Sequence, residues 1–160
     1  PLATLKSVRP DLSIPEVRDG AEWRLFLKMT RRGIPWESPD DVWYPVFARE
    51  VDMTRERRHF RDSGGPSLLP LVEGRMVHQH RFGAKEYIDA TGRRAIWRPT
   101  PPGRSGVHPQ FWIPVDRVPS STRARAGIDR VGFCDIAGQT NERSMLASFI
   151  PAGVICGNKV

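Results

Sequence analysis

The chain has 160 residues, which suffice for one domain with a sizeable core, and its hydrophobic share of 39% exceeds that of a disordered chain. The formal net charge is +7, and two cysteines are too few for a disulfide framework. No apolar run is long enough for a signal peptide or a membrane span, so we expect a cytoplasmic protein. Each cysteine lies in an apolar stretch, so we expect both to be buried free thiols.

The first predicted elements are an arm and a helix. We expect residues 1–14 to be an extended arm and residues 15–160 to form a single domain. Pro15 suits the first position of a helix, Asp19 falls in its first turn, and Gly33 is a natural stop. The apolar side chains of this helix recur at helical spacing: Val17, Ala21, Leu25 and Met29, with Trp23, Phe26 and Leu27 beside them.

The middle of the chain predicts short strands separated by polar turns. Residues 42–51 are rich in aromatic and β-branched side chains and predict a strand. Residues 49–61 are dense in charge and predict a short helix or an exposed turn. Two more strands are expected at 68–72 and 75–80, with a bulge or a sharp bend at Glu73-Gly74.

The predicted strand that follows this bend alternates its side chains between two sides. One side then carries Arg75, Gln79 and Arg81, and the other carries Met76, His78 and His80. Arg and Gln can contact phosphates or base edges, so the first side favours nucleic acid as the ligand. The excess of Arg over Lys points the same way, although a GC-rich genome would give the same composition.

The second half predicts a long loop followed by closing strands. Residues 84–107 are rich in Arg, Gly and Pro, and predict either a mobile arm that orders on DNA or a variable surface loop. A strand is expected at 111–115 and a short helix at 116–125. The closing strands are expected at 130–137, 144–150 and 154–156. Together these elements predict an α+β fold with a mixed or antiparallel sheet of six to seven short strands, one main N-terminal helix and long loops.

Catalytic signatures are missing from the sequence, which has no Walker A, GxGxxG, GxSxG or HExxH motif. His78 and His80 could share a metal ion with another histidine, but no Cys or carboxylate lies at the usual tight spacing, so hydrogen-bonding histidines are the favoured interpretation. Asp40, followed by Glu73-Gly74-Arg75, distantly resembles the acids of a Mg²⁺-dependent nuclease with Arg in place of lysine. We therefore expect no catalytic residue and no metal ligand.

Three blocks of the chain resemble one known family. The block PLVEGRMVHQHRF at 70–82 resembles the Pro-Leu-Tyr-Glu-Gly-Lys-Met-Ile-His-Gln box in the C-terminal part of restriction–modification N6-adenine DNA methyltransferases. The block VGFCDIAGQTNERSMLASFIPAGVICGNKV at 131–160 resembles the companion box of these proteins, and REVDMTRERRHFR at 49–61 resembles the segment that precedes the first box. The departures are Val72 for the usual Tyr, Arg75 for Lys, and Cys134 for Arg.

In that family this region is the target-recognition domain of a type II restriction–modification or phage-defence methylase, and a separate module uses S-adenosylmethionine. The resemblance implies a DNA-binding fragment that is not catalytic alone and holds no cofactor, with double-stranded DNA and the methyltransferase module as partners. The start at Pro1 and the end after an apolar strand also predict a piece of a longer chain. Two other interpretations stay open: a scaffold that docks an acidic partner subunit, and a Mg²⁺-dependent nuclease.

Residue roles follow from these blocks. The expected DNA contacts are Arg75, Gln79, Arg81, Asn141 and Arg143, with Arg94 and Arg98 in the long loop. The expected structural residues are Glu73, Gly74, Asp135 and Glu142. Arg75 can clamp a phosphate or pair with Glu73, and Gln79 can read adenine or satisfy a neighbouring strand. Asp135 is expected to be buried and paired with Arg143 or Arg81.

Overall fold

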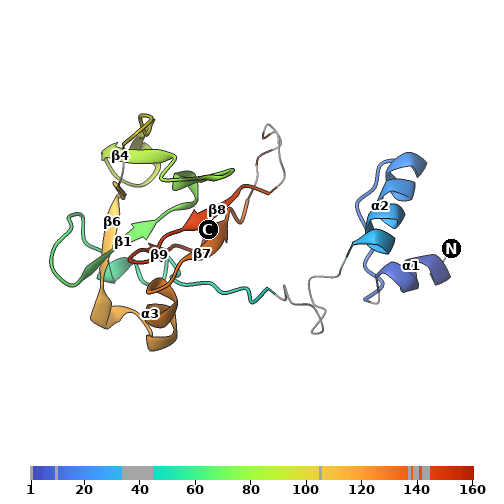
Figure 1. Cartoon of the computed structure of the whole chain (residues 1–160), viewed down its shortest axis with the longest axis horizontal. Helices are drawn as coiled ribbons and strands as arrows, with labels where there is room; N and C mark the ends of the chain where they lie inside the picture. The colour runs from blue at the N-terminus through green and yellow to red at the C-terminus, as the bar shows by residue number, and fades with distance from the viewer. Residues whose placement is uncertain are drawn as a thin grey trace. The chain divides into compact units, whose positions relative to one another are not determined.

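The structure is a computed structural model, and it divides the chain into two compact units, Pro1–Phe47 and Ala48–Val160 (Figure 1). The residues that it describes are 2–9, 11–33, 45–104, 106–136, 138, 141 and 145–160, without the side chain of Arg93. The boundary between the units therefore falls after Phe47, in contrast to the predicted division after residue 14. None of the described helices is both long and apolar enough to cross a membrane.

The unit Pro1–Phe47 contains two described helices, α1 (Leu2–Val8) and α2 (Gly20–Arg32). The helix α1 replaces the predicted extended arm. The predicted main helix is confirmed, but it begins at Gly20 and not at Pro15, because the Asp19 carboxylate accepts hydrogen bonds from the backbone N–H groups that follow it and so caps the helix.

A three-stranded sheet lies at the centre of the unit Ala48–Val160, in the order β6 (Phe111–Pro114), β1 (Leu68–Val72), β9 (Ile155–Cys156). The central strand β1 is antiparallel to β6 and parallel to β9. Leu71 belongs to one buried hydrophobic cluster and Val72 to another, because successive side chains of a strand point to opposite faces. Both faces of this sheet are therefore covered.

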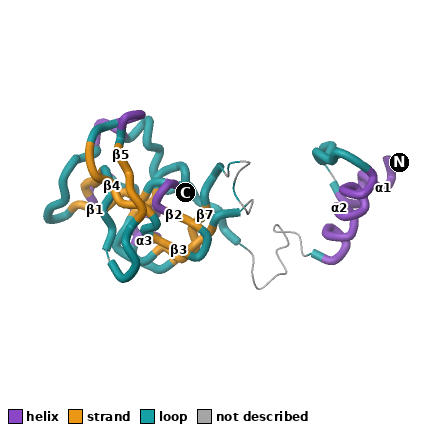
Figure 2. The backbone as a smooth tube through the Cα atoms, turned by 90° about the horizontal axis from the view of Figure 1, so that it is seen from above, coloured by secondary structure: helices purple, strands orange, loops and turns teal. Residues whose placement is uncertain are grey.

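This unit also contains three two-stranded ribbons, and Figure 2 labels at least one strand of each. They pair β2 (Val77–His78) with β3 (Arg81–Phe82), β4 (Lys85–Asp89) with β5 (Ile96–Pro99), and β7 (Arg130–Phe133) with β8 (Ala147–Ile150). The β2–β3 ribbon contacts β7 and β8. The strands thus form several small sheets in place of the one sheet that the sequence predicts.

One short helix, α3 (Ser120–Ala126), and single turns of 3-10 helix complete the described part of this unit. The turns are η1 (Arg57–His59), η2 (Gly74–Met76), η3 (Gly92–Arg94) and η4 (Val115–Arg117). The α+β class is confirmed. The strands predicted at 111–115 and near the C-terminus are also confirmed, as is the short helix, which begins after Pro119.

The predicted loop at 84–107 is wrong over most of its length, because residues 85–99 form the β4–β5 hairpin. Tyr87 and Trp97 lie opposite each other in this hairpin, and their rings meet edge to face at 5.7 Å. Ala90 and Gly92 both have positive φ angles, of 64° and 59°, and let the chain reverse between the strands.

The continuous strand predicted at 75–80 is also wrong. Arg75 lies in the η2 turn, and Gln79 and His80 form the two-residue turn between β2 and β3, with His80 at a positive φ of 58°. Arg75, Gln79 and Arg81 therefore do not share one side of a strand. Of the strand predicted at 42–51, residues 42–44 lie outside the described residues, 45–50 have no strand, and Val51 makes only an isolated bridge.

Candidate nucleic-acid interface

The positive charge of the chain is concentrated in one unit. Ala48–Val160 contains 18 of the 25 Lys and Arg residues and 11 of the 18 Asp and Glu residues, so the entire excess of +7 lies there. Pro1–Phe47 contains seven of each kind and has no net charge. An anionic partner therefore has a much stronger long-range attraction to the second unit.

Because several acids are buried, the surface of this unit has a larger excess of cationic over acidic side chains than its sequence has. Among its described side chains, 14 Lys and Arg are exposed, against five Asp and Glu. Glu73 and Glu86 are buried, and Glu50 has a side chain that is only 4% exposed. Each of these three acids contacts at least one Arg inside the unit, so little of their charge reaches the surface.

Four arginines converge on the β4–β5 hairpin, and we call them the arginine cluster: Arg75, Arg81, Arg98 and Arg104. Arg98 belongs to β5, and it and Arg104 both pair with Glu86 of β4. Arg81 donates to the carbonyl oxygen of Thr100, the residue after β5. The ring of Trp97, also in β5, lies beneath Arg75.

Glu86 holds the inner part of the cluster together. Hydrogen bonding from Arg98, with further attraction from Arg104, lowers the pKa of this buried carboxyl below its usual value, so it remains charged. One carboxylate cannot neutralise two guanidinium groups. The side chain of Arg98 is still 57% exposed, and its outer surface remains open to an anion.

Arg75 pairs with Glu73, as one of the two interpretations that the sequence left open predicted. Its Nε lies 3.6 Å from the Glu73 carboxylate, and its Cζ lies 5.0 Å from the centroid of the Trp97 ring, while 46% of the side chain is exposed. Burial raises the pKa of Glu73, and the Arg75 charge only partly opposes this. Within the described residues, Glu73 Oε1 and Trp97 Nε1 are buried without a hydrogen-bond partner.

Gln79 satisfies a neighbouring strand, as one of its two interpretations predicted. Its Oε1 accepts a hydrogen bond from the backbone N–H of Ala147 at 3.3 Å, and the N–H of His80 donates to the Ala147 carbonyl at 2.8 Å. These two bonds fix the β2–β3 turn to the start of β8. The amide of Gln79 is therefore a poor candidate for reading a base.

The other predicted DNA contacts lie on turns. Arg94 is exposed in η3, at the tip of the β4–β5 hairpin. Asn141 is exposed, and its backbone N–H closes a turn onto the carbonyl oxygen of Gly138 at 3.0 Å. Glu142 and Arg143, for which a structural and a DNA-binding role were predicted, lie outside the described residues.

Two of the three sequence blocks that carry the family resemblance, 70–82 and 131–160, pack against each other. A Cβ on Gly74 would lie 2.6 Å from the carbonyl oxygen of Lys159, so only glycine fits at this position. The Cys134 thiol, at the position where the family has Arg, donates to the carbonyl oxygen of Gly74 at 3.2 Å. Gly74 is thus structural, as predicted, because the C-terminal block passes directly over it.

The predicted burial of Asp135 is wrong. Asp135 is exposed, its carboxylate lies 3.5 Å from Lys159 Nζ, and its backbone N–H donates to the Lys159 carbonyl oxygen. The predicted alternative pair with Arg81 is wrong as well, since the Arg81 guanidinium is directed to Thr100. The role of Asp135 is therefore local: it fastens the C-terminal residues to the turn after β7.

Arg104 and Trp97 belong to the site although the sequence alone did not single them out. The signals that could have found them are the β-forming residues Tyr87 and Trp97 on either side of a turn. Among the described residues, no group of three or more His, Cys, Asp or Glu side chains could hold a metal ion. Asp40 of the distant nuclease pattern lies outside the described residues.

Comparisons with known proteins add no relative to this description: no family model, no curated protein and no solved structure matches the chain.

Proposed function

We propose that this chain is the DNA target-recognition domain of a larger N6-adenine DNA methyltransferase, which binds duplex DNA and is not catalytic alone. The observation that carries the proposal is the excess of 14 exposed Lys and Arg over five exposed Asp and Glu in the described part of Ala48–Val160. Phosphate contacts supply much of the affinity of DNA-binding proteins, and such an excess is what they require.

The arginine cluster supplies the local argument. Arg75 and Arg98 are held by acids on their inner sides and leave their outer surfaces exposed, so they are pre-oriented for phosphates. Arg94, at the tip of the same hairpin, is the best candidate for reaching into a groove. Pre-orientation reduces the entropy lost on binding, which makes these arginines better phosphate ligands than free surface side chains.

A methyltransferase has a physical need for such a domain. An enzyme that modifies a base in duplex DNA must rotate that base out of the stack, at a cost of a few kcal/mol, and must hold the duplex while it does so. In this proposal the separate methyltransferase module binds S-adenosylmethionine and the flipped adenine. The present chain grips the duplex beside it, in the cytoplasm.

Fluorescence anisotropy with labelled duplex DNA over a range of salt concentrations tests the proposal. Log affinity should fall linearly with log salt, and the double substitution Lys85→Gln/Arg94→Gln should lower the slope by roughly 1–2, since each phosphate contact contributes about 0.9. The control Arg117→Gln/Arg123→Gln removes the same charge from η4 and α3, and should change the slope less. Binding that is absent or insensitive to salt would refute the proposal.

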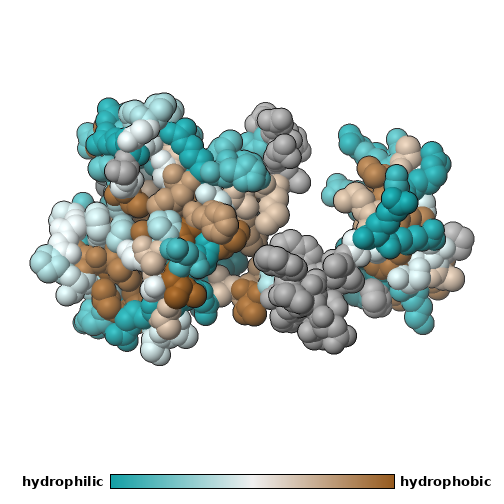
Figure 3. All heavy atoms as spheres, viewed as in Figure 1, coloured by the Kyte–Doolittle hydropathy of each residue, from teal (hydrophilic) through white to brown (hydrophobic). Residues whose placement is uncertain are grey.

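A second candidate function, a scaffold that docks a partner subunit, is favoured by one observation. Val131 of β7 and Phe149 of β8 lie directly opposite each other and are 61% and 78% exposed. Figure 3 shows hydrophobic side chains over the middle of this unit, where Figure 1 draws β7 and β8. If pull-downs with the wild-type chain recover an acidic partner subunit but no DNA, and Phe149→Ser abolishes that recovery, docking is the main function.

A further inference from the structure

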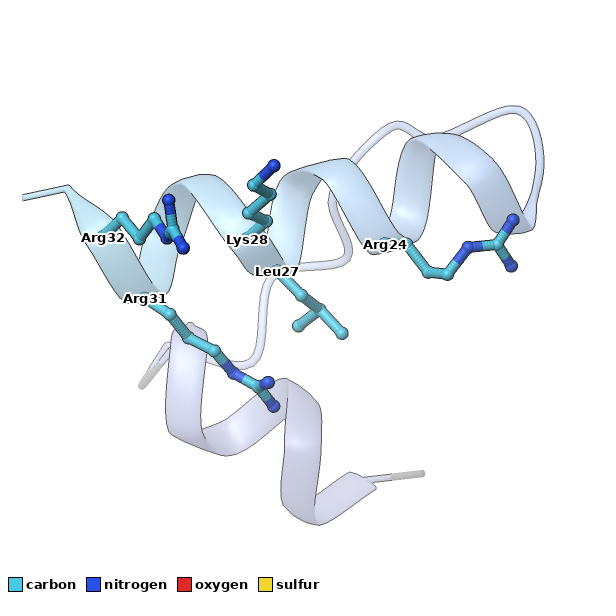
Figure 4. Close-up of a pocket in the computed structure, with 5 residues that line it drawn as sticks. All are labelled: Arg24, Leu27, Lys28, Arg31 and Arg32. Carbon is cyan, nitrogen blue, oxygen red and sulfur yellow. The ribbon is translucent and has the colours of Figure 1, made fainter.

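The helix α2 carries a cationic face that the arginine cluster does not include. Arg24, Lys28, Arg31 and Arg32 line an open hollow of about 320 Å³ together with Leu27 (Figure 4). At 3.6 residues per turn, these four cations fall within an arc of roughly 100° on the helix and extend about 12 Å along it. We call this set the α2 cationic face.

Acidic side chains of α2 and its cap are engaged elsewhere. Glu22 pairs with Arg18 at 2.7 Å, and the Asp19 carboxylate caps the helix. No ion pair within the described part of the chain involves a member of the α2 cationic face. The unit Pro1–Phe47 is neutral as a whole, yet α2 contains four cationic residues and only one acid, Glu22.

The helix itself accounts for only part of this arrangement. Arg31 and Arg32 lie in the last turn, where cations interact favourably with the negative end of the helix dipole. Arg24 lies in the first half of α2, too far from the last turn to gain from that effect. Helix stability therefore does not explain why the same side is cationic from Arg24 onward.

We propose that the α2 cationic face binds the phosphate backbone of duplex DNA, as a contact additional to that of Ala48–Val160; this inference rests on the proposed function. One DNA strand presents one phosphate per 3.4 Å of axis, so a cationic row of about 12 Å can face roughly three phosphates. Phosphate contacts fix the position of a protein on DNA without reading sequence. The α2 cationic face would thus add affinity that is the same for every duplex.

The structure favours DNA over an anionic membrane as the occupant. A helix that lies on a membrane must offer a broad free apolar face beside its cations. On α2, however, Trp23 and Phe26 are half-buried and stack on each other at 5.7 Å. The exposed large apolar side chains of α2 are Leu25 and Met29, which at 3.6 residues per turn lie within an arc of roughly 40° next to Arg32, too narrow for a membrane-binding face.

The test uses the whole 160-residue chain and a labelled duplex, in anisotropy titrations over a range of salt concentrations. Arg24→Gln/Lys28→Gln should lower the salt slope by roughly 1–2, which is a loss of affinity of roughly tenfold to a hundredfold at 0.1 M salt, for duplexes of any sequence. The control Lys6→Gln/Arg18→Gln removes the same charge from the same unit, outside the α2 cationic face, and should leave the slope nearly unchanged. Circular dichroism of both variants checks that the helices are intact.

The outcomes separate this inference from the proposed function. If the wild-type chain binds DNA but both variants retain the wild-type slope, the α2 contact is refuted and the DNA-binding function stands. Equal losses in both variants would also refute it, because net charge alone would then be responsible. If the wild-type chain does not bind DNA, the proposed function fails and this inference fails with it. Loss of binding to phosphatidylserine vesicles, with unchanged DNA binding, would identify the face as a membrane contact and refute the proposal.

Discussion

Arg130 and Glu50 form a two-pronged ion pair inside the unit Ala48–Val160, although 80 residues separate them in the sequence. Arg130 Nη2 lies 2.8 Å from Glu50 Oε2, and it also donates to the carbonyl oxygen of Val154. The same carboxylate oxygen accepts from the backbone N–H of Cys156 in β9. This pair connects the start of the unit to β7 and to its central sheet.

Glu50→Gln should lower the free energy of unfolding by about 3 kcal/mol, because it leaves a largely buried guanidinium without its counter-charge. Urea denaturation followed by circular dichroism measures the loss. The control Asp116→Asn removes an exposed acid beside Arg117 and should cost less than about 0.5 kcal/mol. Equal stability of the Glu50 variant and the wild type would show that the pair contributes nothing to folding.

Patterns of nearby residues predicted only part of this molecule. The helical spacing of Val17, Ala21, Leu25 and Met29 predicted α2, and the strand-like residues 111–115 predicted β6. The β4–β5 hairpin was missed because Arg, Gly and Pro dominate residues 84–107, whereas the contact of Tyr87 with Trp97 exists only once the strands have paired.

Pairs between distant residues could not be predicted from local patterns at all. Nothing near Glu50 in the sequence indicates Arg130 as its partner. The cross-strand contact of Glu86 with Arg98 becomes visible only when the hairpin between them is recognised. Of the candidate site, Arg75 and its neighbour Glu73 were therefore identified from the sequence, but Glu86, the acid that orients Arg98, was not.

Gly74→Ala should destabilise the protein by about 1–3 kcal/mol, because the added Cβ would lie 2.6 Å from a backbone oxygen of Lys159 that cannot move without shifting the C-terminal segment. Thermal unfolding measures the change. Gly65→Ala is the matched control, since its nearest neighbour is a Leu68 side-chain atom at 3.6 Å, and it should be nearly neutral. Two equally stable variants would mean that the C-terminal block does not press on Gly74.

Glu73→Gln should become more stabilising, relative to the wild type, as the pH rises. Burial raises the pKa of Glu73 in the folded protein above its unfolded value near 4.5, so the folded state holds the proton more tightly. The stability from this proton is present below pH 4.5 and is lost as the pH rises through the folded pKa. Urea denaturation of both proteins from pH 3 to pH 8 should show that the free energy of unfolding of the variant, relative to that of the wild type, increases with pH. If this difference does not change with pH, the pKa of Glu73 is not raised.

The Cys156 thiol should be unreactive in the folded protein. Burial, reinforced by the nearby Glu50 carboxylate, raises the pKa of Cys156 to about 12, so only about one molecule in 10⁴ carries this thiolate at pH 8. Burial also raises the pKa of the half-buried Cys134. In a Cys134→Ser variant, Ellman's reagent should find no reactive thiol until denaturant is added. Rapid labelling of the native variant would show that Cys156 is accessible.

Glu86→Gln should increase the affinity for DNA, a result that damage to the fold would not produce. The substitution keeps an acceptor for Arg98 but removes the charge that restrains two members of the arginine cluster. If the cluster contacts phosphates, the affinity for duplex DNA should rise roughly threefold to tenfold at 0.1 M salt, because a carboxylate that repels the phosphates has been removed. Asp116→Asn makes the same change in net charge away from these arginines and should raise the affinity less. Anisotropy titrations in which both variants gain equally would assign the effect to overall charge, and no gain in either would place the phosphates elsewhere.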